Sequence, residues 1–300
     1  MGERWRAGRV VAVLWALCAC WIPAAAQAPL DVQTIVVRVG QRVAEYYRRA
    51  QNLICTETSV VFPIRTDWSP DGMPRTVQSE LHLELAAAHG GSEPSATVVR
   101  EIRLINGRVP RERDKKNANG CMDPQPLSPA PLDFLLPAHR GDYRFTSVRA
   151  GNKDGRAAIG VDFKSRDPKS KAELNEDPRG LDGCFDTSGP IAAAGRVWVD
   201  AHTFDVLRVE QHIEGPVGIR VPVKVQRRDG LPDWVTLDRD DLTVDYKVVA
   251  FTDPGEALLV QTSIDEMELW RGGLQSVRRS DTYSDYRRFL TDARIVRDER

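Results

Sequence analysis

The alternation of apolar and polar residues predicts that β-strands make up most of this chain. From Val77 to Leu85, apolar side chains occupy nearly every second position and polar side chains lie between them, which is typical of a strand with one buried face. The segments 98–105 and 242–248 repeat this alternation. Runs rich in β-branched and aromatic residues predict further strands at 54–64, 143–148, 156–163, 219–226 and 257–264.

Two short interruptions of the apolar pattern predict β-hairpins. In the run Gly195–Glu210, a polar reversal at 200–205 separates two apolar strands. Near the C-terminus, Gly272-Gly273 separates the segments 267–270 and 274–279. Short connections of this kind join antiparallel neighbours, so the sheet is expected to be antiparallel.

Residues 31–50 follow a different period. Apolar residues recur there at spacings of three and four, and charged residues fill the opposite face, which predicts an amphipathic helix with Asp31 as its N-cap. A second, short helix is predicted at 132–139, where it would lie across the sheet as a lid. A plain surface turn anchored in the core is the alternative for that segment.

Together these elements predict an α+β fold with a large curved antiparallel sheet of about ten strands. Residues 27–300 are expected to form a single α+β domain, with long loops at 110–131 and 166–189. The acidic run 238–241 is expected to be a solvated turn. Calcium binding is its alternative, although the spacing of an EF-hand is absent.

The N-terminus predicts export. Three arginines precede the apolar run 10–17, and small residues at 24–26 provide a cleavage site, so residues 1–26 are expected to be a signal peptide. An uncleaved anchor is one alternative, but the run is shorter than the roughly 20 residues that span a bilayer. Lipidation at Cys20 is another. We expect the mature chain in the periplasm or cell envelope.

The charge balance argues against a nucleic-acid partner. The chain has 42 Lys and Arg residues and 43 Asp and Glu residues, for a formal net charge of −1. Binding to nucleic acid depends on concentrated positive charge, which this composition lacks. No segment after the predicted signal peptide is apolar and long enough for a transmembrane helix.

Three cysteines remain after removal of the signal peptide, so at most one intramolecular disulfide can form. Cys121 and Cys184 lie in loops rich in Gly, Pro and Asp, where the backbone can adopt the required geometry, and we expect these two to pair. A bond from Cys55 to either of them is the alternative. No cysteine has a second Cys or His at the spacing of a metal site.

No arrangement of residues typical of an enzyme emerges from the sequence. The five histidines are not paired at metal-ligand spacing, and there is no G-x-S-x-G nucleophile elbow or glycine-rich phosphate loop after a strand. Cys55 would act as a nucleophile only beside a histidine brought close by the fold. We therefore predict no catalytic residue, no metal and no cofactor.

Several segments carry a family resemblance. They are Asn52–Glu57, Val197-Trp198-Val199-Asp200, Asp245-Tyr246-Lys247, Phe251–Glu256 and Tyr286–Phe289. In this set the chain resembles a family of uncharacterised exported bacterial proteins, whose layout is similar at the fold level to periplasmic lipoprotein carriers of the Lol type. The resemblance implies an incomplete β-barrel that is concave and apolar inside and accepts lipid acyl chains.

The leading hypothesis is therefore a non-enzymatic exported protein that binds an apolar ligand, a lipid or lipoprotein acyl chain, in a concave β-sheet. The alternative is an envelope interaction or assembly module with a solid core, whose charged loops contact a partner protein. The candidates for the apolar, ligand-binding face are Leu81, Leu83, Leu85, Trp198, Leu207, Val209, Val244 and Tyr246.

Overall fold

The structure is a computed structural model, and it places most of the chain after residue 30. The described residues are 31–49, 52–86, 95–111, 122, 130–167, 169–177, 184–252 and 255–288. The predicted signal peptide at 1–26, Cys20, Cys121 and most of the predicted loop 110–131 lie outside the described residues, and the domain bounds 27–300 stay a prediction. Within the described part of the chain, no helix has both the length and the apolar character needed to cross a bilayer.

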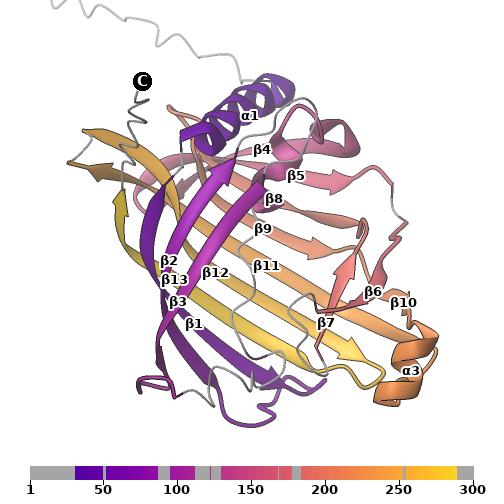
Figure 1. The fold of residues 1–300 in the computed structure, drawn as a ribbon. Helices are drawn as coiled ribbons and strands as arrows, with labels where there is room; N and C mark the ends of the chain where they lie inside the picture. Colours follow the sequence, from indigo (N-terminus) through magenta and orange to yellow (C-terminus); the bar gives the residue numbers. More distant parts are fainter. Residues whose placement is uncertain are drawn as a thin grey trace, which may run out of the picture. The chain divides into compact units, whose positions relative to one another are not determined.

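One large antiparallel sheet dominates the described residues (Figure 1). Its eleven strands follow the order β3-β2-β1-β13-β12-β11-β9-β8-β5-β4, and β10 pairs with β11 alone. The sheet is open and curved, with β3 and β4 as its edges, so the predicted α+β class is confirmed. The strands are β1 (Leu53–Ile64), β2 (Arg75–Ala86), β3 (Ser95–Ile105), β4 (Tyr143–Lys153), β5 (Arg156–Ser165), β8 (Ala193–Asp200), β9 (Val206–Ile213), β10 (Val217–Arg220), β11 (Trp234–Phe251), β12 (Glu256–Arg271) and β13 (Ser276–Arg288).

The predicted hairpin at 195–210 is confirmed as β8 and β9, and its turn is built by one aspartate. The Asp200 carboxylate accepts hydrogen bonds from the backbone N–H groups of His202 at 2.9 Å and Thr203 at 3.0 Å. Burial opposes ionisation, yet these bonds and the nearby Arg156 lower the pKa of Asp200 below its usual value. The turn therefore closes on a charged carboxylate that satisfies its own backbone.

The predicted N-terminal helix is confirmed as α1 (Val32–Arg49), which covers one end of the concave face of the sheet (Figure 1). Asp31 caps it by accepting the N–H of Gln33 at 3.1 Å. The apolar face of α1 packs with the 3₁₀ helix η2 (Ala130–Leu135) and with strand residues in the main apolar cluster. This cluster includes Ile35, Val36, Val39, Val43, Tyr47, Leu132, Phe134, Leu135, Leu53, Leu83, Val161, Val197, Val209, Val244 and Tyr246.

Several predicted segments are folded differently from expectation. The segment at 132–139 is largely the 3₁₀ helix η2 followed by turns, and the predicted loop 166–189 contains a separate two-stranded sheet, β6 (Glu173–Glu176) with β7 (Phe185–Ser188). The predicted strand 219–226 divides at Pro222 into β10 and the helix α3 (Val223–Asp229). Proline has no N–H to donate to a ladder, so the strand ends there.

The acidic run 238–241 is not a turn, which corrects the prediction. It lies inside β11, which continues without a break from Trp234 to Phe251. The partner strand β12 supplies the backbone pairing, with Asp240 opposite Glu268 and Asp241 opposite Met267. Tertiary pairing therefore overrides the weak strand propensity of aspartate.

Candidate functional site

The concave face of the sheet, on which α1 lies, divides into three zones along the strands. On β1 the buried side chains are those of alternate residues, beginning with Leu53 and continuing to Val61. The upper zone is the main apolar cluster beneath α1. The lower zone, near α3, is a second apolar cluster that includes Ile213, Ile219, Val235, Leu237 and Trp270.

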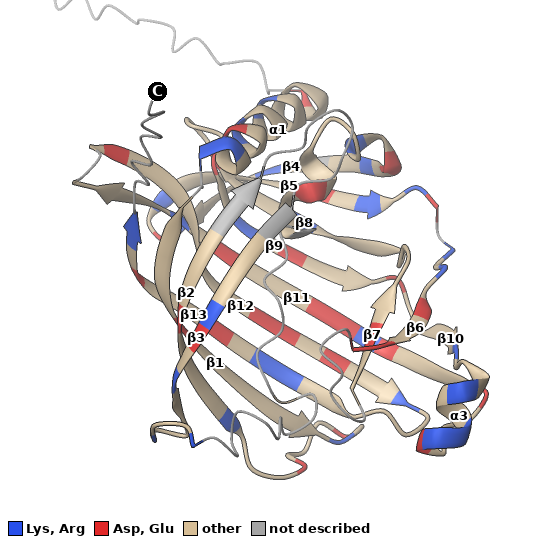
Figure 2. Cartoon of the chain, viewed as in Figure 1, with Lys and Arg blue, Asp and Glu red and all other residues tan. Residues whose placement is uncertain are grey.

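Between these zones the buried positions become polar, and we call this middle zone the polar belt. Figure 2 shows charged positions on neighbouring strands between α1 and α3. Strand register places the belt residues next to one another: Ser59 lies opposite Asp281, Arg279 opposite Glu266, and Glu268 opposite Asp240. The belt comprises Glu57, Ser59, Arg75, Ser79, Arg100, Asp240, Glu266, Glu268, Arg279 and Asp281.

Two ion pairs account for part of the charge of the belt. Arg100 donates from Nε and Nη2 to the two carboxylate oxygens of Glu57, at 2.7 and 2.9 Å, and Glu57 is only 1% exposed. Arg279 donates from Nη1 to Glu266 at 2.8 Å. Bidentate and buried contacts of this kind are the strong class of ion pair.

Three of the belt carboxyl groups have strongly raised pKa values. Burial, together with the charges of Glu268, Glu266 and Asp241, raises the pKa of Asp240 to about 8. Burial raises that of Glu266 to about 7, with Glu268 adding to the shift, and burial raises that of Asp281 to about 6. The belt therefore carries more carboxyl groups than its basic groups stabilise in the charged form.

Buried polar atoms without a partner in the described structure also lie in the belt. They include Oδ1 of Asp240, Oδ1 of Asp281, Nε of Arg279 and Oγ of Ser79. Asp281 and Arg279 are each 6% exposed and Ser79 is 1% exposed. Buried polar groups are nearly always hydrogen-bonded in native proteins, so these atoms lack partners that the described residues do not supply.

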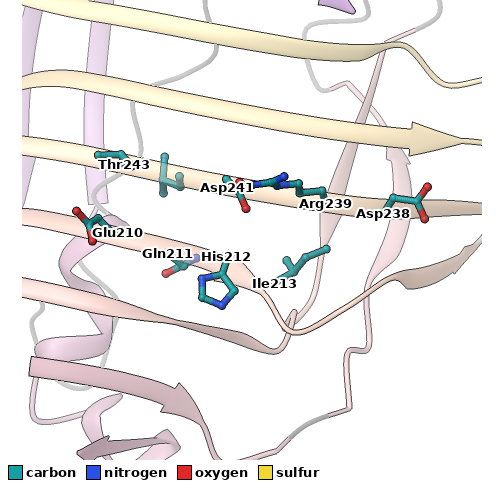
Figure 3. Close-up of a pocket in the computed structure, with 9 residues that line it drawn as sticks. Glu210, Gln211, His212, Ile213, Asp238, Arg239, Asp241 and Thr243 are labelled. Atoms are coloured by element: carbon teal, nitrogen blue, oxygen red, sulfur yellow. Dashed lines mark hydrogen bonds and ion pairs between the residues drawn. The ribbon is translucent and has the colours of Figure 1, made fainter. Parts of the chain in front are cut away.

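A pocket of about 530 Å³ opens at the point where β9 separates from β11 (Figure 3). The last pair of those strands is Asp241 with His212, after which β10 takes over as the neighbour of β11. Its lining is mostly polar, with Ile213 and Leu242 as the apolar members. Among the described residues, no three His, Cys, Asp or Glu side chains are placed to hold a metal ion.

The structure gives Cys55 a packing role. It is a free thiol, 1% exposed, in a small cluster with Leu81 and Tyr283. Burial, followed by the charge of Glu57, raises its pKa to about 12, so the thiol stays protonated. Its free state removes the alternative in which Cys55 forms the disulfide. Cys184 is buried, and because Cys121 is outside the described residues, the Cys121–Cys184 bond stays a prediction.

The structure brings most of the predicted ligand-binding residues to the concave face. Leu83, Val209, Val244 and Tyr246 belong to the main apolar cluster, and Leu81 to the small cluster around Cys55. Leu207 is buried beside the β-bulge of the β8–β9 pair. The side chain of Leu85 lies outside the described residues. Contact of these residues with a ligand remains a proposal.

Trp198 is placed apart from that set. Its neighbours Val197 and Val199 are fully buried in the main apolar cluster, so the alternation of the strand directs Trp198 to the opposite face. There its ring lies over the backbone of Gly151 and Gly160, and the Arg196 guanidinium is 5.4 Å from the ring centroid. The indole thus packs on the outer surface of the sheet.

The polar belt is not among the features predicted from the sequence, although the sequence contains a signal for it. In β1 the residues that face the core run from Leu53 through Cys55 to Glu57 and Ser59. A glutamate at a core-facing position of a strongly apolar strand is uncommon unless it is paired. The alternation of residues in the sequence shows that Glu57 faces the core. Its partner Arg100, however, belongs to a strand more distant in the sequence.

The fold thus defines an open, curved antiparallel sheet with a helix on its concave face. No family model and no curated protein sequence matches the chain. Three solved structures are similar in fold. One is an outer membrane lipoprotein-sorting protein domain from Vibrio parahaemolyticus, with 11% identity, a TM-score of 0.42, and coverage of 85% of this chain and 92% of that chain.

The second is a LolA superfamily protein from Nitrosomonas europaea, with 13% identity, a TM-score of 0.33, and coverage of 88% of this chain and 96% of that chain. The third is a DUF1329 family protein from Desulfovibrio piger, with 11% identity, a TM-score of 0.44, and coverage of 87% of this chain and 95% of that chain. These likenesses concern fold and say nothing of the ligand or partner of this chain.

Proposed function

We propose that this chain is a non-enzymatic exported protein that binds an apolar ligand, a lipid or lipoprotein acyl chain, on the concave face of its sheet. One observation carries the proposal. Among the described residues, the apolar zone of an open, curved sheet is covered by the helix α1 and the short η2, rather than by a second sheet as in a sandwich. A cover of this size can be displaced as a unit.

The energetics of such a displacement are balanced. Five side chains of α1 are 0–1% exposed, and burying each contributes roughly 1.5–3 kcal/mol, or about 7–15 kcal/mol together. An acyl chain of about 14 methylene groups gains roughly 0.8 kcal/mol for each one it buries, or about 11 kcal/mol. A long acyl chain can therefore replace the contacts that α1 would give up.

The rim of α1 is fastened by partly exposed polar contacts. Arg42 donates to Asp205 at 2.9 Å, and Arg49 contacts Glu256 at 3.2 Å and the carbonyl of Ala257 at 3.3 Å. Pairs this exposed contribute about 1 kcal/mol or less each. They set the position of the helix without making its cover permanent.

The test combines lipid extraction with a binding assay. Mass spectrometry of protein purified from the cell envelope should detect lipid, and a fluorescent acyl probe should bind the delipidated protein. The double variant Arg42→Gln/Arg49→Gln should accelerate probe association several-fold because α1 is less tightly fastened. Arg103→Gln, on the exposed face of β3, is the matched control and should leave the rate unchanged. Absence of both lipid and probe binding would reject the proposal.

A second candidate is an envelope interaction module with a solid core. The observation that favours it is the dense packing under α1, where Ile35, Val43 and Leu135 are 0% exposed. In that case the delipidated protein should unfold cooperatively, bind no acyl probe, and leave the Arg42/Arg49 variant indistinguishable from wild type in that assay.

A further inference from the structure

The polar belt crosses the concave face between the two apolar zones. A purely apolar ligand lying across it would leave the buried charged groups of the belt without partners. Five carboxyl groups and three guanidinium groups face this zone. Glu57 and Glu266 are paired with Arg100 and Arg279. The structure shows no ion pair from Asp240, Glu268 or Asp281 to a basic group among the described residues, and Glu268 accepts only the indole N–H of Trp270 at 3.3 Å.

We propose that the polar belt binds the ammonium group of an amphipathic ligand whose chain lies on the adjoining apolar zone. The chain component of this inference rests on the proposed function. The ammonium component rests on the unpaired carboxyl groups and on the buried atoms that lack partners. Asp281, which is 6% exposed and has an unpartnered Oδ1, faces the same interior as Ser59 across the β1–β13 pair.

The placement of the oxygen acceptors in the belt favours one class of cation over another. A divalent metal ion needs several ligands converging on one point, and no such group of acidic, His or Cys side chains exists among the described residues. The unpartnered acceptors Oγ of Ser79, Oγ of Ser59 and Oδ1 of Asp281 instead lie on the neighbouring strands β2, β1 and β13, about 4.8 Å apart from strand to strand. A primary ammonium group, with three N–H donors on a compact centre, suits acceptors arranged in this way.

The raised pKa values of Asp240, Glu266 and Asp281 agree with this assignment. Burial and neighbouring carboxylates disfavour the charged form of each group, and an ammonium ion placed beside Asp281 would favour its charged form. The same acceptors disfavour an anionic head, since a fatty-acid carboxylate has no N–H or O–H group to donate to them.

The test measures the affinity of the full chain for dodecylamine, dodecanol and dodecanoate, with butylamine as a competitor that has the ammonium group without the long chain. We expect dodecylamine to bind at least tenfold more tightly than the other two at neutral pH, and butylamine to displace it. The preference should disappear below about pH 5, where the belt carboxyl groups with raised pKa values are protonated.

The variant Asp281→Asn should reduce the preference for dodecylamine several-fold. Asp265→Asn, on the exposed face of β12, is the control and should retain it. Equal binding of all three long-chain ligands would overturn the ammonium site and leave the proposed function standing. Preference for dodecanoate would overturn it as well, and failure of every long-chain ligand to bind would overturn both.

Discussion

Removal of Arg100 should destabilise the fold strongly, because Glu57 would keep its carboxylate in the interior without a partner. Both carboxylate oxygens of Glu57 accept from Arg100, and the side chains are 1% and 17% exposed. Breaking a buried ion pair by deleting one partner costs about 3–5 kcal/mol. A domain of this size loses roughly 2–4 °C per kcal/mol, so Arg100→Met should lower Tm by about 6–20 °C.

Urea unfolding followed by circular dichroism measures the change. The double variant Glu57→Gln/Arg100→Met should recover most of the loss, because a neutral, well-packed pair replaces a buried ion pair at little net cost. Arg103→Met is the matched control on the same strand, where the side chain is 50% exposed, and should change stability by less than about 1 kcal/mol. A change in stability for Arg100→Met as small as that of this control, or a double variant no more stable than the single one, would contradict this prediction.

Three further substitutions test the packing and the charge of the sheet. Asp240 has a folded-state pKa of about 8 against an ordinary value of 3.8, so the folded state holds a proton that the unfolded state releases. Stability should therefore fall as pH rises from about 4 to about 8, by up to roughly 1.4 kcal/mol per unit, and Asp240→Asn should flatten this slope in urea midpoints. Gly40→Ala would place a Cβ 2.6 Å from the Leu135 carbonyl oxygen and push α1 off η2, which should cost about 1–3 kcal/mol in urea titration; an unchanged midpoint would contradict the contact. Gly195→Ala would drive its Cβ into the Glu210 carbonyl of the paired strand, so amide exchange in the β8–β9 hairpin should accelerate, whereas wild-type protection would contradict the register.

The sequence predicts the elements whose signals are local. Helix α1 follows from the spacing of Ile35, Val39 and Val43 above a capping aspartate, and the β8–β9 hairpin follows from two apolar strands around Asp200. These patterns are complete within a few residues. The elements they predict are therefore the ones found in the structure.

The missed features depend on partners far along the chain. The strand at Asp238–Asp241 exists because β12 pairs with it, and the polar belt exists because Glu57 on β1 meets Arg100 on β3. The apolar character of Trp198 does not determine which face of the sheet its side chain is on. Its neighbours Val197 and Val199 point to the core, so the alternation of the strand places the indole on the outer face. Composition and propensity do not contain this information.

The most direct test of the proposed function is photo-crosslinking with an acyl chain that carries a diazirine group, followed by peptide mapping. We predict crosslinks at concave-face residues such as Leu83, Val209 and Val244. These crosslinks should be competed away by unlabelled dodecylamine. Crosslinks confined to outward side chains such as Val99 and Phe62, or no crosslinks at all, would contradict it.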